Sequence, residues 1–153
     1  DLMKLIPGDI VCDLYGGVGL FTMPITKKIG NEGHVHLVEI SNHSARDAFK
    51  IFKDYNNVSI HRGSVDRKLP KINNIDIIIL DPPRSGAGKK VIGQIISKKP
   101  RAVVYISCDP ASLARDAKFL YDSGYKLDKI KAVDLFPMTH HIECIVRFIP
   151  STN

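Results

Sequence analysis

The segment from Ile75 to Leu80 constrains the fold more than any other part of this 153-residue chain. Apart from Asp76 it is apolar, and it ends at Asp81, which two prolines follow. Consecutive apolar positions are typical of a strand that is buried on both faces, as in parallel sheets, and the prolines prevent the strand from continuing. We therefore expect a central parallel strand that delivers Asp81 to the carboxyl edge of a sheet.

Strand and helix patterns alternate along the rest of the chain. We predict further strands at 10–15, 34–40, 58–61, 102–106, 126–136 and 142–149. We predict helices at 20–29, at 42–55 with an Asn42 cap, at 88–97 and at 110–121, and the end of a helix at 1–5. A short loop joins the last two strands, which favours an antiparallel pair. The fold class is therefore α/β, a doubly wound and mostly parallel sheet with one reversed strand near the C-terminus.

Composition fits one globular domain over residues 1–153, because 44% of the residues are hydrophobic and 25% are charged. We find no stretch that could span a membrane and no sign of an obligate protein partner. Three cysteines, at 12, 108 and 144, lack metal-ligand spacing and favour a cytoplasmic location without a metal. The net charge of +6 and the pI near 9.3 are compatible with a polyanionic partner such as RNA.

A glycine-rich loop follows the first predicted strand. It contains Gly17 and Gly19, and glycines there let the backbone turn sharply and approach a ligand. Thr22 stands where the dinucleotide fingerprint has its third glycine, which disfavours a pyrophosphate cofactor. Glu39 ends the second strand, where a carboxylate can accept the hydroxyls of a ribose. Together they indicate an adenosine pocket, and S-adenosylmethionine fits it, although a tight turn and a surface acid are the alternatives.

Cys108 lies between a strand and the N-terminus of a helix that Asp109 and Pro110 begin. The positive end of the helix dipole favours a nucleophilic thiolate, whereas the adjacent Asp109 carboxylate opposes it. A buried structural cysteine is the alternative. Asp81 and the residues after it form a stiff wall at the same sheet edge, where Arg84 is a candidate for phosphate or base contact. The alternative there is a proline-stiffened loop.

Four motifs in order carry a resemblance that covers nearly the whole chain: DLYGGVGLFT (13–22), LDPPRSG (80–86), YISCDPASLARD (105–116) and DLFPMTHHIEC (134–144). The chain resembles the catalytic domain of the RNA uracil-5-methyltransferases, which make 5-methyluridine in transfer and ribosomal RNA. The resemblance implies a Rossmann-like class I methyltransferase fold with S-adenosylmethionine as methyl donor and RNA as substrate. The family's N-terminal RNA-binding regions are expected to lie outside this sequence.

The resemblance also assigns roles. It implies that Tyr15, Glu39 and Asp81 line the cofactor pocket, that Cys108 is the nucleophile, and that Glu143 is the base. The thiolate would add to C6 of uracil so that C5 can attack the methyl group, and the base would then remove the C5 proton. A reversed last strand places Glu143 at the edge where Asp81 and Cys108 lie.

Two departures and three alternatives accompany this reading. Ser64 stands where many relatives have an acid beside the adenine, and Asp109 stands where many have Asn. Without the family context, His140 and His141 with Glu143 and Cys144 would suggest a weak metal site. The other functions are an amino-group methyltransferase that uses the DPP loop without a cysteine and a non-catalytic RNA-binding module.

Overall fold

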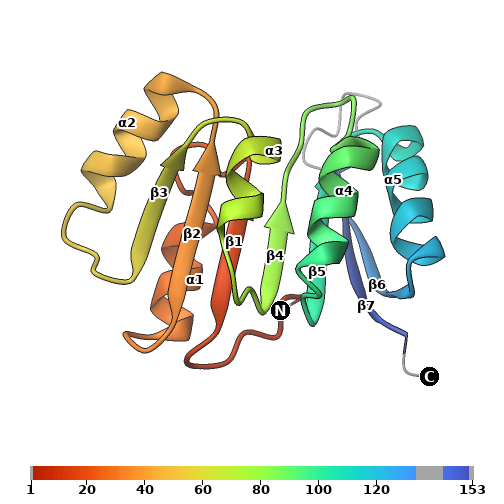
Figure 1. Cartoon of the computed structure of the whole chain (residues 1–153), viewed down its shortest axis with the longest axis horizontal. Coiled ribbons are helices and arrows are strands. Elements are labelled where there is room, and N and C mark those ends of the chain that lie inside the picture. The colour runs from red at the N-terminus through yellow and green to blue at the C-terminus, as the bar shows by residue number, and fades with distance from the viewer. Residues whose placement is uncertain (1, 134–142, 152–153) are drawn as a thin grey trace.

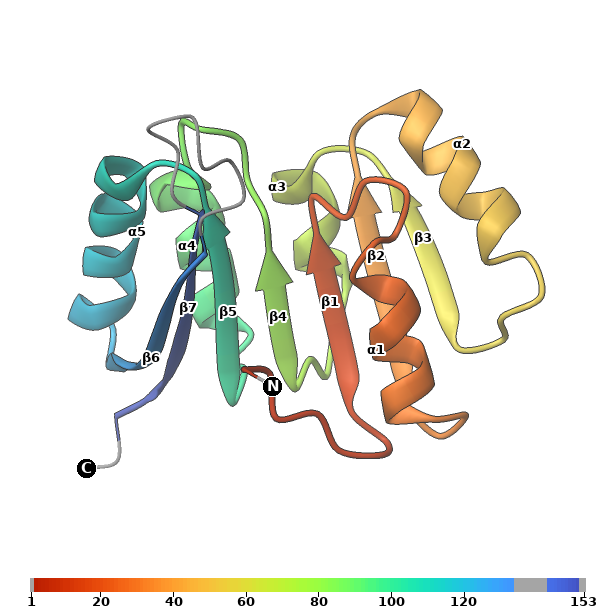
Figure 2. The same ribbon diagram turned by 180° about the vertical axis from the view of Figure 1, so that it is seen from behind.

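The computed structural model describes residues 2–133 and 143–151 and contains one sheet with helices on both faces (Figure 1, Figure 2). The sheet order is β3-β2-β1-β4-β5-β7-β6. The strands are β1 (Ile10–Leu14), β2 (His34–Glu39), β3 (Val58–Arg62), β4 (Ile77–Leu80), β5 (Ala102–Ser107), β6 (Tyr125–Val133) and β7 (Glu143–Pro150). Neighbours from β3 to β5 pair in parallel, and β7 is antiparallel to both β5 and β6. The predicted fold class, with its single reversed strand, is confirmed.

Five α-helices and a 3₁₀ turn connect the described strands. They are α1 (Thr22–Ile29), α2 (Asn42–Ile51), α3 (Val65–Lys68), η1 (Leu69–Lys71), α4 (Gly88–Ser97) and α5 (Pro110–Asp122). The predicted cap of α5 is confirmed, because the Asp109 carboxylate accepts a hydrogen bond of 2.7 Å from the Ser112 amide.

Four local predictions are wrong. The cap of α2 is Ser41, whose hydroxyl accepts the Ser44 amide at 3.3 Å, and Asn42 is the first helical residue. This helix ends at Ile51 and α1 begins at Thr22, so both are shorter than their apolar spacing suggested. Residues 2–5 are not helical, and the short helices at 65–71 were not expected. Short turns of this kind have too few residues to show a periodicity.

Two apolar layers enclose the sheet. One layer joins Leu14, Ile78 and Leu80 to residues of α3, α4 and α5, which lie in front of the sheet in Figure 1. The other joins Ile77 and Ile79 to α1, which lies in front in Figure 2. Each residue of β4 is at most 2% exposed, so the expectation of a strand buried on both faces is confirmed.

The carboxyl ends of the parallel strands face the upper edge in Figure 1, and the loops that follow them gather there. Open α/β sheets bind ligands at this edge, which is where the predicted site residues lie. No helix in the described ranges is both long and apolar enough to cross a membrane.

Candidate active site

The loop after β1 turns back over the sheet with an unusual backbone. Tyr15, Gly17 and Gly19 have positive φ angles of 61°, 56° and 96°. The Gly16 amide donates to the Val38 carbonyl at 3.1 Å, and the Gly19 amide donates to the Gly16 carbonyl at 2.8 Å. Backbone hydrogen bonds therefore hold the loop against the end of β2, so a ligand above it meets main-chain atoms.

The two predicted cofactor glycines serve different purposes in this structure. A Cβ atom on Gly19 would collide with the ring of Phe52, so this glycine permits close packing of the loop on α2. A Cβ on Gly17 would meet nothing within 4 Å. The space above Gly17 is thus open to a ligand, whereas the contact visible for Gly19 is internal.

Asp13 fixes the start of the loop to the first turn of α1. Its carboxylate is 1% exposed and accepts the Thr22 hydroxyl at 2.7 Å. Burial is the main cause that raises the pKa of Asp13 to about 6. Thr22, the residue that replaces a third glycine, therefore closes the loop through its side chain.

Glu39 combines a structural bond with capacity for a ligand. It is 8% exposed; its Oε2 accepts the Gly17 amide at 2.9 Å and its Oε1 accepts the Ser41 amide at 2.6 Å. Each carboxylate oxygen has two lone pairs, so each retains an acceptor position. Glu39 thus joins the glycine loop to the start of α2 and can still receive two hydroxyls.

A pocket of about 300 Å³ opens beside the glycine loop. Its lining comes from the loop, the end of β2, α3 and α4: Tyr15, Ile40, Ser64, Val65, Asp66, Ala87, Lys90 and Val91. Its volume lies at the lower end of the range for small-molecule sites. Burial raises the pKa of Tyr15 to about 12, so its hydroxyl remains a hydrogen-bond donor at neutral pH. Both Tyr15 and Ser64 therefore line a cavity at the place where the sequence suggested adenine.

Cys108 occupies the turn between β5 and α5 and is a half-buried free thiol. The Ser107 hydroxyl donates to the Asp109 carbonyl at 2.9 Å, and the Asp109 amide donates to the Ser107 hydroxyl at 3.1 Å. Together with the Asp109 cap, these bonds fix the path of the chain on both sides of Cys108. The thiol is therefore carried by a rigid turn.

Glu143 begins β7 beside this turn. Ser107 pairs with Cys144 as the last pair of the antiparallel register, so Cys108 and Glu143 are the next residues of the two chain segments. Burial raises the pKa of Asp81, and the nearby Glu143 carboxylate raises it further. Asp81, Cys108 and Glu143 therefore lie in one neighbourhood, although they come from three strands.

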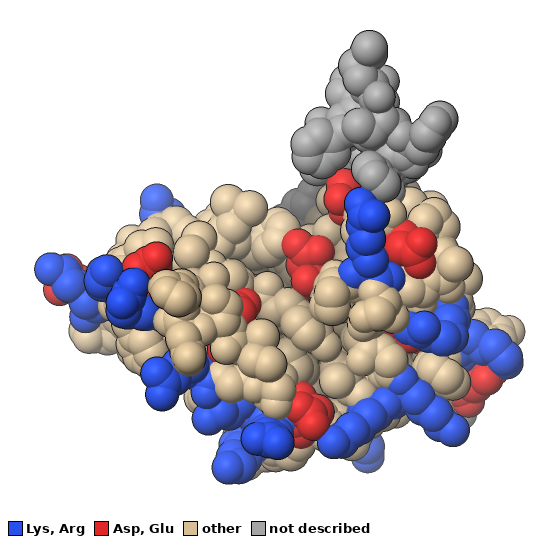
Figure 3. Space-filling view, turned by 90° about the horizontal axis from the view of Figure 1, so that it is seen from above, with Lys and Arg blue, Asp and Glu red and all other residues tan. Residues whose placement is uncertain are grey.

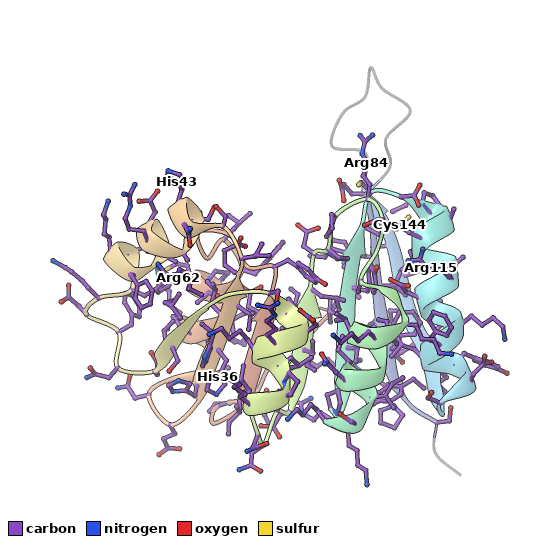
Figure 4. The ribbon with its side chains drawn as sticks, turned by 45° about the horizontal axis from the view of Figure 1, so that its top comes forward. His36, His43, Arg62, Arg84, Arg115 and Cys144 are labelled. Carbon is purple, nitrogen blue, oxygen red and sulfur yellow. The ribbon has the colours of Figure 1, made fainter. Side chains whose placement is uncertain are left out.

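Arg84 extends upward from the loop after β4 in Figure 4. Hydrogen bonds from Ser112 are the main cause that holds the pKa of Asp109 below its usual range, and the positive charge of Arg84 contributes. Arg84 is therefore close to the Cys108 turn, where a cation could meet a phosphate.

A buried carboxylate that the sequence did not single out joins the two loops of this region. Asp116 on α5 is fully buried, and its Oδ2 accepts hydrogen bonds from the Tyr105 hydroxyl at 2.8 Å, the Ala87 amide at 2.7 Å and the Gly88 amide at 3.1 Å. The signal was present, because Asp116 falls between Leu113 and Leu120 at the spacing of a buried helical face. A charged residue at such a position indicates an internal polar network.

Arg115 completes the network from the neighbouring position. Its guanidinium donates to Asp116 Oδ1 at 2.9 and 3.1 Å and to the Ser85 carbonyl at 2.7 Å. Gly86 has a φ of 79°, and a Cβ there would lie 2.5 Å from the Arg115 Nη2 atom. The loop that follows Asp81 is thus clamped onto the helix that follows Cys108.

Part of the site lies outside the described residues, including His140 and His141 of the metal alternative. In the ranges that the structure does describe, no three His, Cys, Asp or Glu side chains are grouped to hold a metal ion. Glu39, Gly17 and Tyr15 come together in one half of the edge, and Asp81, Arg84, Cys108 and Glu143 come together in the other. Their individual roles stay predictions.

Comparisons with known proteins agree with this geometry. The family model described as tRNA (uracil-5-)-methyltransferase matches residues 34–149. An RNA methyltransferase of Streptomyces avermitilis is 43% identical over 99% of this chain and 36% of its own length. A 23S rRNA (uracil(1939)-C(5))-methyltransferase of Shewanella sediminis is 39% identical, over 97% of this chain and 34% of its own. This chain thus spans about a third of these relatives.

A solved structure is similar as well. The tRNA (uracil-54, C5)-methyltransferase of Pyrococcus abyssi, in complex with S-adenosyl-L-homocysteine, superposes with a TM-score of 0.80 and 30% identity. The match covers 95% of this chain and 36% of that protein.

Proposed function

Because this chain belongs to the tRNA (uracil-5-)-methyltransferase family, we propose that it is the catalytic region of an enzyme that methylates C5 of a uridine in tRNA or rRNA. S-adenosylmethionine is the methyl donor in this proposal, and RNA is the partner. A free thiol at each cysteine is compatible with a reducing compartment, which supports a cytoplasmic location.

The residues of the glycine-loop half fit S-adenosylmethionine. Two acceptor positions on Glu39 match the two hydroxyls of a ribose, and the pocket lined by Tyr15 and Ser64 can take the adenine. The open space over Gly17 leaves room for the rest of the molecule. When bound, S-adenosylmethionine supplies a sulfonium methyl group. We assign these residues to holding and orienting it.

The chemistry on the uracil falls to two side chains. The Cys108 thiolate forms a bond to C6, and the electron pair of the C5=C6 bond moves to C5, which can then take up the methyl group. The Glu143 carboxylate accepts the C5 proton. The electron pair of the broken C–H bond restores C5=C6, and the bond to sulfur breaks to return the Cys108 thiolate. Asp81 would help to fix the reacting groups at this edge.

The antiparallel register of β5 and β7 carries the proposal, because Cys108 and Glu143 are the residues next to its last pair, Ser107 with Cys144. The Glu143 carboxylate also contributes to the raised pKa of Asp81, which is consistent with these two acids lying at the same edge of the sheet. A nucleophile and a base in such proximity can act on two adjacent ring atoms, as this reaction requires.

A covalent adduct tests the mechanism. With RNA that contains 5-fluorouracil, the full-length protein should form a stable adduct, because fluorine at C5 cannot leave as a proton. Cys108→Ala should abolish it and should lower methyl transfer by on the order of 10⁴-fold or more. Cys144→Ala is the matched control, since this free thiol lies on the adjacent strand, and it should form the adduct.

Three outcomes would contradict the proposal. An adduct that persists in Cys108→Ala would overturn the assigned nucleophile. Full methyl transfer by that variant would instead support an amino-group methyltransferase that uses the loop after β4. Failure of the full-length protein to bind S-adenosylmethionine in calorimetry would favour a non-catalytic RNA-binding module.

A further inference from the structure

A second pocket lies outside the site described above, between α2 and the end of β3. It has a volume of about 330 Å³, and its lining is Asn42, His43, Arg46, Phe49 and Arg62. We call it the α2 pocket. Two guanidinium groups, an imidazole and an aromatic ring line it, and no carboxylate does. Its chemistry is that of a site for an anion that also carries a flat ring.

The two arginines of the α2 pocket have no ion pair with any residue in the described ranges. The acids nearby are engaged elsewhere: Asp47 pairs with Lys50 at 3.2 Å, and both oxygens of Glu39 accept backbone amides. In Figure 3, Lys and Arg side chains lie at the left, over the α2 end of the molecule, as well as along its lower and right-hand sides. The positive charge of the pocket is therefore available to an external anion.

Phe49 adds an apolar surface that the fold does not use. Its side chain is 52% exposed, whereas Ala45 and Ala48 on the inner face of α2 are fully buried. An exposed ring beside unpaired guanidinium groups can stack on an unpaired base while the arginines contact the flanking phosphates. Single-stranded RNA offers both groups in one strand, and a free phosphate ion offers only one.

The α2 pocket lies at the same sheet edge as the reaction site. Arg62 ends β3 and is the register partner of Glu39 at the end of β2. Figure 4 places His43 and Arg62 at the end of the molecule opposite Arg84. Four strand spacings separate β3 from β5, so the two sites are about 19 Å apart along the edge at about 4.8 Å per spacing. About six stacked nucleotides at a rise of about 3.4 Å cover that distance.

We propose that the α2 pocket binds one unpaired nucleotide of the substrate RNA, at a position up to about six nucleotides from the target uridine. Arg46 and Arg62 contact its phosphates, and Phe49 stacks on its base. This inference rests on the proposed function, because it assigns an RNA contact to the same reaction. It adds a site that neither the reaction nor the methyl donor requires.

The test compares two variants that remove equal charge from the full-length protein. Arg46→Gln/Arg62→Gln should weaken RNA binding by about tenfold or more, and should reduce the slope of log affinity against log salt by about 1.4, since each single-strand phosphate contributes about 0.7. Lys27→Gln/Lys28→Gln, at the exposed end of α1 on the opposite edge, should leave both quantities unchanged. Phe49→Leu should weaken binding about tenfold without changing the slope.

Three readouts separate this inference from the proposed function. Calorimetry with S-adenosylmethionine and adduct formation at saturating 5-fluorouracil RNA should be unaffected by the arginine variant. Equal loss of RNA affinity in the lysine control, or no loss in the arginine variant, overturns the α2 pocket. A lower melting temperature of the arginine variant without loss of RNA affinity also overturns RNA binding by the α2 pocket. It would show that the pocket binds another segment of the protein instead. Absence of an adduct in the unmutated protein overturns the proposed function alone.

Discussion

The two halves of the carboxyl edge are each organised by a buried carboxylate, but the two carboxylates differ in what remains available to a ligand. Glu39 accepts one backbone amide on each oxygen and retains a free acceptor position on both. Asp116 accepts three hydrogen bonds on one oxygen and two from Arg115 on the other, and it is fully buried. Glu39 can therefore bind a ligand while it holds the glycine loop, whereas Asp116 can only hold the surrounding loops in place.

This difference separates two ways of building a site. In the half formed by β1 and β2, Glu39 holds the glycine loop and the start of α2 through two backbone amides, and α3 and α4 complete the lining of the pocket beside that loop. In the half formed by β4, β5 and β7, the network around Asp116 fixes the loop after β4 relative to α5, the helix that follows Cys108. Substitutions should therefore affect cofactor affinity in the first half and reaction rate in the second.

After Cys108→Ala, the largest effect is expected from Glu143→Gln in the second half. An amide cannot accept the C5 proton, so methyl transfer should fall by about 10²- to 10⁴-fold while S-adenosylmethionine affinity stays the same. The covalent adduct with natural RNA should accumulate, which denaturing gel electrophoresis detects. Glu32→Gln, at an exposed turn, is the control. Unchanged turnover in Glu143→Gln would remove Glu143 from the mechanism.

A smaller loss of rate is expected from Asp116→Asn. The amide nitrogen cannot accept, so one set of donors, either the loop amides or Arg115, loses its partner at a cost of about 1–3 kcal/mol. The turnover number should fall about 10- to 100-fold, with a smaller loss of S-adenosylmethionine affinity, because Ala87, whose amide Asp116 holds, also lines the pocket beside the glycine loop.

Asp122→Asn removes an exposed carboxylate from the same helix, where it pairs with Lys118, and should have neither effect. The comparison between the two halves would be broken if Asp116→Asn weakened cofactor binding as much as it slowed turnover.

The reciprocal effect is expected from Glu39→Gln in the first half. One backbone amide and one ligand hydroxyl then face an NH₂ group, so S-adenosylmethionine affinity should fall about tenfold, corresponding to about 1.4 kcal/mol. Turnover at saturating S-adenosylmethionine should stay within about twofold. Calorimetry measures the affinity, and a main effect on turnover at saturation would show that Glu39 does not act through binding.

The smallest effect concerns acid stability, which should also differ between the halves. His34, His36 and His61 cluster on β2 and β3, with His36 Nδ1 and His61 Nε2 joined at 3.0 Å. Burial, with a contribution from the other two imidazoles, lowers the pKa of His36 to about 4. The unfolded chain therefore binds more protons below pH 6.5, and stability that is present above 6.5 is lost as the pH falls toward 4.

His36→Asn should flatten this dependence. The loss amounts to about 1 kcal/mol after allowance for solvent, or about 2–4 °C in melting temperature between pH 7 and pH 4.5. Hydrogen exchange should show β2 and β3 opening before β4 and β5. Uniform opening of the whole sheet in acid would contradict the assignment to the imidazole cluster.

The sequence was sufficient for the sheet and its reversed strand, because strand burial and turn chemistry are local signals. Ile77 to Leu80 shows this best, since its apolar run alone predicted a central strand. The roles of Tyr15, Cys108 and Glu143 came instead from the family resemblance, and they stay predictions.

The hydrogen-bond network of Asp116 and Arg115 was not predictable in the same way. Asp116 becomes fully buried only when α4 and α5 pack together, and its partners at Ala87 and Gly88 lie almost thirty residues away. The only sequence signal of this long-range packing is that Asp116 shares the helical spacing of the buried Leu113 and Leu120.

The place of β7 in the sheet has a consequence for the order in which a newly made chain acquires its parts. This strand lies between β5 and β6, both of which leave the ribosome before it. Strands β1 to β5 can pair in sequence and form the half with Glu39 early, whereas β6 reaches the sheet only through β7. Glu143 therefore joins Cys108 only after β7 has paired with β5, and until then a nascent chain holds the proposed nucleophile without the proposed base.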